Sequence, residues 1–134
     1  MNRKIMGIIE QLDVTVNYSS LLDRGGYYIP DVNMIFINSS LSDFEQEKNL
    51  LHELGHAANH REESFIYKTV SSMHCEMEYQ ANCSMVEGLL DQYIDKTGLE
   101  PYEINYVSFI EESSLSIRYE YVVKKLLEKK INIA

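Results

Sequence analysis

The sequence of 134 residues lacks a long apolar segment, and this limits the kinds of protein that it can encode. No apolar run approaches the roughly 20 residues that span a bilayer, so we expect no membrane partner and no membrane-spanning helix. Residues 1–14 are interrupted by Glu10 and Asp13 and do not have the apolar centre of a signal peptide. We therefore expect a protein that stays in the cytoplasm.

Cysteine is scarce, with only Cys75 and Cys83 in the chain. They stand eight residues apart in a predicted helix, which separates their Cα atoms by about 12 Å. A disulfide needs a Cα separation below about 7 Å. We therefore expect two free thiols in a reducing compartment, where they pack as small apolar residues.

Basic residues are also few, because 12 Lys and Arg face 21 Asp and Glu and leave a net charge of −9. Direct binding to nucleic-acid phosphates needs a basic surface, so this class of protein is excluded. Internal repeats, low-complexity stretches and Gly/Ser linkers are absent from the sequence. The length suits one hydrophobic core, and we predict a single domain over residues 1–134.

Two histidines separated by three residues form the most informative pattern, His52-Glu53-Leu54-Gly55-His56. Residues four apart lie on the same face of a helix, because 3.6 residues complete a turn, so both imidazoles can reach one zinc ion. Glu53 projects beside such a metal, where it can accept a proton from the attacking water. The pattern is typical of zinc metalloproteases and predicts His52 and His56 as ligands and Glu53 as the base.

A helix is predicted around this pattern. Ser42 or Asp43 can cap it at its start, and it runs to about Asn59. Its apolar side chains gather on one broad face away from the histidines: Phe44, Leu50, Leu51, Leu54, Ala57 and Ala58. This face can pack into a core while the histidines line a cleft.

A catalytic zinc site usually has three protein ligands and one water, so a third ligand is required. His60 continues the four-residue spacing, but its Cα lies about 12 Å along the helix from that of His52. Three side chains of one straight helix cannot close a tetrahedron over this span. We expect His60 to be a surface residue at the end of the helix.

A second predicted helix, about residues 74–96, offers better candidates for the third ligand. Glu78 falls on the apolar face of this helix and Glu76 at its polar edge. A carboxylate on a buried face is costly unless it is paired or binds a metal, so Glu78 is the favoured ligand. His74 is an alternative ligand, or a hydrogen-bond donor that lines the site.

Other side chains can line the predicted site. Asn82 lies one helical turn from Glu78. The transition state of peptide hydrolysis needs a hydrogen-bond donor besides the metal. The candidates for this donor are Tyr27, Tyr28, Tyr79 and His74.

The segments 50–56 and 78–82, Glu-Tyr-Gln-Ala-Asn, together resemble the ImmA/IrrE metallopeptidases, which are small intracellular zinc proteases often encoded by phages. That family has H-E-x-x-H followed, on the next helix, by Glu-x-x-Ala-Asn or Glu-x-x-Ala-Asp. The resemblance covers about residues 1–97. It implies a zincin-like domain with Zn²⁺ as cofactor, His52, His56 and Glu78 as ligands and Glu53 as the catalytic base.

The remaining patterns predict an α+β fold with a short mixed or antiparallel sheet packed on helices. Residues 2–12 have the spacing of an amphipathic helix, and residues 14–18 alternate like a half-buried strand. Residues 27–29 and 34–37 are expected to form two strands joined by a hairpin connection. Where such a strand leaves an edge exposed beside the zinc helix, an extended substrate can add to it.

The C-terminal part is predicted to be helical. Residues 61–73 are expected to connect the two zinc-bearing helices. Gly98 and Pro101 end the second of these helices. Two further helices, at 102–112 and 116–130, are expected in a C-terminal extension over 98–134.

The resemblance also implies a narrow protein substrate. Proteins of this family often cleave a helix-turn-helix repressor encoded beside them, which makes them antirepressors. The predicted partner is therefore a DNA-binding repressor, and the chain has no recognisable DNA-binding module of its own. The alternative is a non-catalytic binding protein that sequesters a regulator, with a structural or vestigial zinc.

Overall fold

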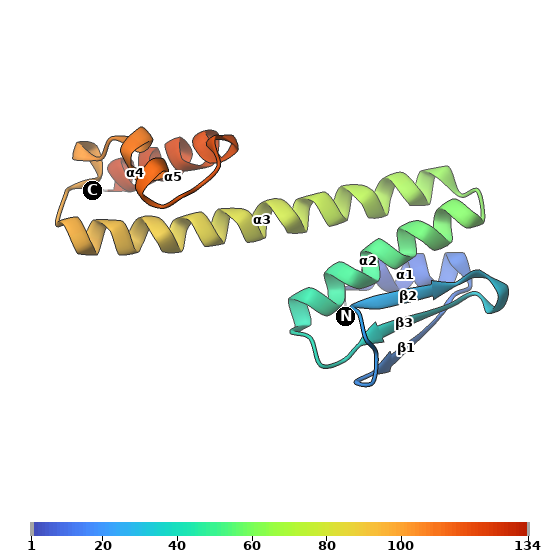
Figure 1. Ribbon diagram of the computed structural model, residues 1–134. Helices are drawn as coiled ribbons and strands as arrows, with labels where there is room; N and C mark the ends of the chain where they lie inside the picture. Colours follow the sequence, from blue (N-terminus) through green and yellow to red (C-terminus); the bar gives the residue numbers. More distant parts are fainter. Residues whose placement is uncertain (1, 134) are drawn as a thin grey trace. The chain divides into compact units, whose positions relative to one another are not determined.

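The structure is a computed structural model that describes residues 2–133, and the chain divides into two compact units (Figure 1). The first unit is Met1–Met77 and the second is Glu78–Ala134. Each has its own cluster of buried apolar side chains. The boundary falls within one long helix, α3 (Ser64–Thr97). The grouping of all residues into one domain, with a family-like core over 1–97, stays a prediction.

The first unit contains a mixed sheet of three strands, which confirms the predicted α+β class. The strands are β1 (Thr15–Ser19), β2 (Gly26–Ile29) and β3 (Met34–Asn38). β3 lies in the middle, parallel to β1 and antiparallel to β2. β2 is therefore an edge strand.

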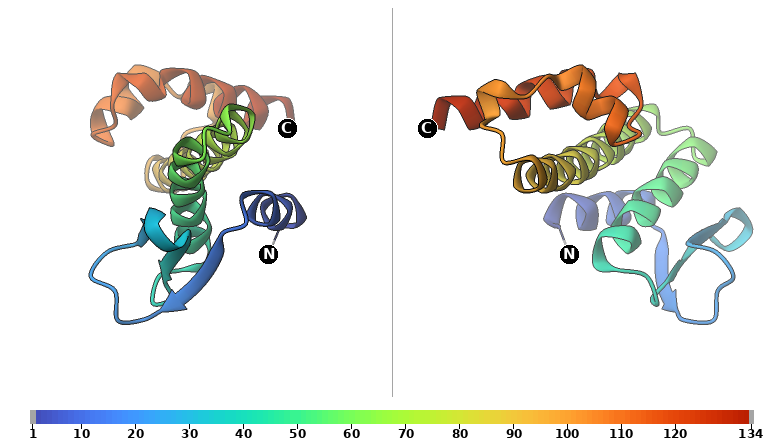
Figure 2. Two further views of the ribbon diagram at one scale, coloured as in Figure 1. Left: turned by 90° about the vertical axis from the view of Figure 1, so that its right-hand side faces the viewer. Right: turned by 60° about the vertical axis from the view of Figure 1, so that its left-hand side comes forward.

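Two helices cover one face of this sheet (Figures 1 and 2). They are α1 (Arg3–Leu12) and α2 (Asp43–His60). Side chains alternate along a strand, and Ile35 and Ile37 of β3 both point to the covered face, where they are fully buried. The buried residues of α1 and α2 pack with them into one core. The apolar face predicted for α2 is buried except at Phe44, which is 38% exposed.

The connection between β2 and β3 is a short 3-10 turn, η1 (Pro30–Val32), followed by Asn33 in the left-handed region with φ 50°. The Asn33 amide donates to the carbonyls of Leu12 at 3.0 Å and Asp13 at 2.7 Å. Asn33 also accepts a hydrogen bond from the Tyr28 hydroxyl at 3.1 Å. One side chain thus ties the end of α1 to the hairpin.

The start of α2 is capped by Ser42, whose hydroxyl accepts from the backbone N–H of Glu45 at 3.2 Å. This is one of the two predicted caps. The Gln46 amide donates to the carbonyl of Leu41 at 2.8 Å and so also ties the first turn of α2 to the preceding loop. The cap fixes the residue at which α2 begins after β3.

The prediction of a connection over residues 61–73 was wrong, because α3 already begins at Ser64. Its first turns carry many polar residues, which obscured the apolar periodicity. Ile66, Val70, Met73 and Met77 nevertheless recur at helical spacing and pack on the core of the first unit. At the other end Gly98 adopts φ 70° and terminates the helix as predicted.

The second unit is helical. Residues 78–97 of α3 are joined by α4 (Tyr106–Glu112) and α5 (Glu120–Ile133). The 3-10 turns η2 (Pro101–Glu103) and η3 (Ile117–Tyr119) precede α4 and α5, so both α-helices begin later than predicted. Its buried core consists of Val86, Leu90, Phe109, Ile110, Val122, Val123 and Leu127. No helix within residues 2–133 is long and apolar enough to cross a membrane.

Leu54 stands between Glu53 and Gly55 and is fully buried in the core of the first unit. We expect Leu54→Ala to lower the free energy of unfolding by about 2–5 kcal/mol, since it removes buried methyl groups and leaves a cavity. Urea denaturation followed by circular dichroism measures this. Leu21→Ala is the matched control, because Leu21 is 92% exposed, and should change stability by less than about 0.5 kcal/mol. Equal effects would contradict the described burial of α2.

Candidate metal centre

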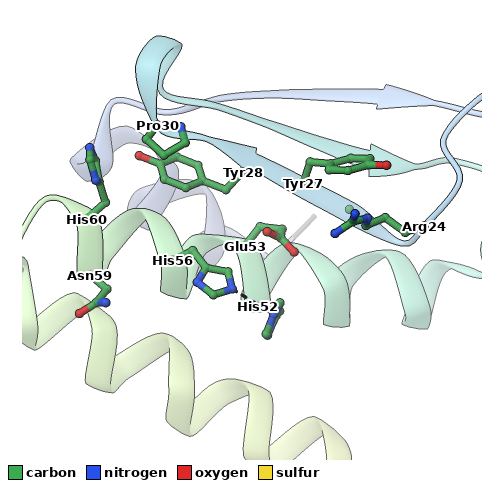
Figure 3. Close-up of a pocket in the computed structure, with 10 residues that line it drawn as sticks. Arg24, Tyr27, Tyr28, Pro30, His52, Glu53, His56, Asn59 and His60 are labelled. Carbon is green, nitrogen blue, oxygen red and sulfur yellow. Dashed lines mark hydrogen bonds between the residues drawn. The ribbon is translucent and has the colours of Figure 1, made fainter.

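His52 and His56 place two imidazole nitrogens close together on the exposed side of α2 (Figure 3). Their Nε2 atoms are 3.2 Å apart, and the two rings are nearly perpendicular at 87°. In a tetrahedral site with Zn–N distances of about 2.0–2.1 Å, two ligand nitrogens are ~3.3 Å apart. The pair therefore has the spacing of two ligands of one zinc ion, and imidazole is a donor that zinc prefers.

Glu53 lies between the two histidines in sequence but is only 7% exposed. The backbone of β2 passes close to its side chain at Gly26. A Cβ atom built on Gly26 would lie 3.3 Å from Glu53 Cγ and 3.0 Å from the carbonyl oxygen of Phe36. A side chain at this position would be crowded by β3 and Glu53, so a glycine suits the close passage of β2. The glycine pair Gly25-Gly26 just before the predicted strand 27–29 was the one signal in the sequence for this contact.

A cleft of about 520 Å³ runs between β2 and α2 (Figure 3). β2 and the residues around it form one wall and α2 forms the other. The residues lining it are Arg24, Gly26, Tyr27, Tyr28, Pro30, His52, Glu53, His56, Asn59 and His60. Since β2 is an edge strand, a strand edge borders the cleft that contains the histidines and Glu53.

The two tyrosines of β2 both use their hydroxyl groups within the protein. The Tyr27 hydroxyl donates to the carboxylate of Asp23. This hydrogen bond lowers the pKa of Asp23 and raises the pKa of Tyr27, because it stabilises the ionised carboxylate and the protonated phenol. The Tyr28 hydroxyl donates to Asn33. Both rings are thus held in place as walls of the cleft.

The far end of the cleft is formed by His60 and Tyr28, whose ring centroids are 6.1 Å apart. His60 is the exposed last residue of α2, as expected for a residue that is not a ligand. The sequence did not predict that Arg24, Pro30, Asn59 and His60 line the cleft. For the two α2 residues the signal was available, since Asn59 and His60 follow His56 by three and four positions.

His74 lies on the other side of the histidine pair from β2. It lines a second hollow of about 310 Å³ together with His52 and His56. Its ring centroid is 6.1 Å from that of His52. Within the first unit the structure therefore gathers four of the predicted site residues, His52, Glu53, His56 and His74.

The other predicted site residues, Glu78, Tyr79 and Asn82, belong to the second unit. Glu78 is partly buried and Glu76 is exposed, in the order expected from the apolar pattern. Tyr79 is 52% exposed, and a hydrogen bond with the Cys83 side chain raises its pKa. Among residues 2–133 no group of three or more His, Cys, Asp or Glu side chains is arranged to hold a metal ion. The role of Glu78 as third ligand stays a prediction.

The sequence was compared with known proteins. A family model described as the IrrE N-terminal-like domain matches residues 9–94, a segment that contains His52, Glu53, His56 and Glu78. Neither the curated proteins nor the solved structures gave a match. The matched segment is more than half of the chain, and the protein belongs to the ImmA/IrrE family of metallopeptidases.

Proposed function

We propose that the protein is a zinc-dependent peptidase in which His52, His56 and Glu78 hold the metal and Glu53 is the catalytic base. The observation that carries this proposal is the pair of Nε2 atoms 3.2 Å apart beside a buried carboxylate in an open cleft. A structural zinc site has no use for a carboxylate between its ligands that lines a cleft. Membership of a metallopeptidase family supports the same chemistry.

Zinc, when bound, would lower the pKa of a water molecule and polarise the scissile carbonyl. The protein supplies the acid–base chemistry. Glu53 accepts a proton from the attacking water and then donates it to the leaving amine. The close passage of β2 at Gly26 restricts the positions open to the Glu53 side chain, so the carboxylate is oriented before the substrate arrives.

The donor that stabilises the developing negative charge on the substrate is best assigned to His74. Of the four candidates, Tyr27 and Tyr28 already donate their hydroxyl hydrogens to Asp23 and Asn33. Using either of them would break an existing hydrogen bond. His74 lies beside His52 and lines the hollow next to the predicted metal ligands. An N–H of its imidazole is a donor of the kind that this developing charge requires.

The substrate is proposed to be a protein segment in extended conformation. The free edge of β2 borders the cleft and offers backbone donors and acceptors to a peptide strand. A DNA-binding repressor of a phage or mobile element is the narrower proposal, made from the family resemblance. The net charge of −9 suits a basic partner of this kind.

A non-catalytic protein that sequesters a regulator is the second candidate function. The two functions differ in their need for Glu53, because binding alone does not require a base.

Glu53→Gln removes the base while preserving the size of the side chain. We expect it to keep zinc at the wild-type level and to lower the cleavage rate at least about 100-fold, since general-base catalysis contributes about that much or more. Cleavage of a co-expressed helix-turn-helix repressor, followed on a gel and by reporter output, measures this. Glu63→Gln is the matched control, because Glu63 is exposed and lies outside the cleft. Equal relief of repression by wild type and Glu53→Gln would favour the sequestering protein.

Zinc content tests the third ligand. We expect about one zinc per chain in the wild type and a much weaker affinity in Glu78→Ala, because two histidines alone leave the coordination incomplete. Glu76→Ala, two positions away and exposed, should retain the metal. Measurement is by atomic emission after equilibrium dialysis against zinc buffers. If zinc binding survives in Glu78→Ala, the proposed ligand set is wrong.

His74→Ala separates the role of a donor from that of a ligand. As a donor, His74 is expected to contribute about 100- to 1,000-fold to kcat and nothing to zinc affinity. The cleavage rate and the zinc content of the same preparation are the two readouts. Loss of zinc together with activity would instead make His74 a metal ligand, and unchanged kcat would remove it from the mechanism.

A further inference from the structure

We propose that Arg24 makes one end of the cleft a binding site for a carboxylate group of the peptide substrate. The inference rests on the peptidase function proposed above and adds the chemistry by which a substrate is selected. Arg24 lines the cleft together with Gly26, Tyr27 and Glu53. Figure 3 shows its side chain at the opposite end of the cleft from His60 and Pro30.

The charges that line the cleft single out Arg24. Among the residues that line the cleft, Arg24 is the one with a guanidinium or ammonium group, and Glu53 is the one with a carboxylate. This distribution contrasts with the whole chain, in which acidic residues outnumber basic ones by 21 to 12. A substrate group that enters the Arg24 end therefore meets a positive charge in a generally acidic molecule, which favours a negative partner at this position.

The backbone of Arg24 is held by the buried end of β3. The Asn38 amide donates to the Arg24 carbonyl at 3.3 Å, and the Asn38 backbone N–H donates to the Gly25 carbonyl at 2.9 Å. Asn38 is itself 9% exposed, and its side-chain oxygen accepts from the backbone N–H of Ser40 at 3.0 Å. Arg24 is thus fixed at the start of β2, and the substrate does not have to order this turn.

The side chain of Arg24 is also oriented. Its guanidinium carbon lies 4.4 Å from the centroid of the Tyr27 ring, a cation–π contact. A guanidinium that rests on a ring still presents the N–H groups at its edge, in the fork that matches a carboxylate. Arg24 forms no salt bridge with the other residues of 2–133, but its positive charge, after the hydrogen bond from Tyr27, helps to lower the pKa of the neighbouring Asp23 carboxylate. The neighbouring Asp23 carboxylate accepts the hydrogen bond of the Tyr27 hydroxyl.

The position of Arg24 places the carboxylate close to the bond that is cut. Gly26 is the residue of β2 beside Glu53. Arg24 precedes it by two residues, in the bend that leads into β2, so their Cα atoms lie at most about 7 Å apart. A substrate paired with β2 would then carry its carboxylate two or three residues from the scissile bond. Either an acidic side chain or the C-terminal carboxylate of a substrate can fill this site.

Two pairs of short peptide libraries test the proposal. In the first pair both termini are blocked and one central position is fixed as Glu or as Gln, with uncharged residues elsewhere. In the second pair the peptides carry no acidic side chain and end in a free carboxylate or an amide. Binding to zinc-loaded Glu53→Gln protein is measured by fluorescence polarisation of the labelled libraries. Cleavage by the zinc-loaded wild type is located by mass spectrometry.

We expect about tenfold tighter binding of the carboxylate member of at least one pair, equivalent to one charge-assisted hydrogen-bonded contact. Arg24→Ala should abolish this preference, and Arg24→Glu should reverse it toward the uncharged member of each pair. Arg3→Ala, which removes an exposed arginine of α1 outside the cleft, should leave it unchanged. A preference in the first pair identifies a side chain as the source of the carboxylate, and one in the second pair identifies the chain terminus.

The remaining outcomes separate this inference from the peptidase function. A preference that depends on Arg24 without cleavage by the wild type leaves the carboxylate site standing and overturns the peptidase. Cleavage of both members of each pair at equal rates, with equal binding, leaves the peptidase standing and overturns the carboxylate site. A preference that survives Arg24→Ala also overturns it.

Discussion

The burial of one face of α2 against β3 determines the direction of the α2 side chains in the cleft. Leu50, Leu54 and Ala57 are held in the core with Ile35 and Ile37 of the sheet. Because a helix places residues four apart on one face, this packing leaves His52 and His56 together on the exposed side. The apolar residues of α2 thereby set the geometry of the polar ones, and a rotation of the helix by one residue would bury the histidines and expose the core.

Two asparagines that bracket β3 fix the two ends of the cleft wall. Asn33, just before the strand, holds the Tyr28 hydroxyl and the end of α1. Asn38, its last residue, holds the backbone of Arg24. Both act through several hydrogen bonds to main-chain groups, so each makes an irregular segment as well defined as the strand beside it. The hydrogen bonds of Asn33 and Asn38 thus shape the cleft as much as the residues that line it.

The hairpin, the α2 helix and the relative positions of His52, Glu53 and His56 on that helix could be predicted from the sequence. All three depend on local periodicity and turn chemistry. The sequence was insufficient for the start of α3, where polar residues mask an apolar spacing of three and four. Exposure along α3 also could not be predicted from the sequence, since the apolar side chains of Tyr79 and Met85 are 52% and 44% exposed. A helical wheel gives the face of a helix but not the extent to which other elements cover it. Arg24 and Gly26 were missed as cleft residues because their place depends on contacts with α2 and β3, which are distant in sequence.

The shortness of β2 has a consequence for solubility. An edge strand with free backbone donors and acceptors can pair with any exposed strand, including that of a second copy, and so promote aggregation. β2 spans only Gly26–Ile29 and is followed by Pro30, which has no N–H to donate. α2 forms the opposite wall of the cleft and restricts the approach of a broad sheet. An edge of this length has room for a few residues of a single peptide, as the proposed mode of substrate binding requires, and offers little on which one sheet could extend into another.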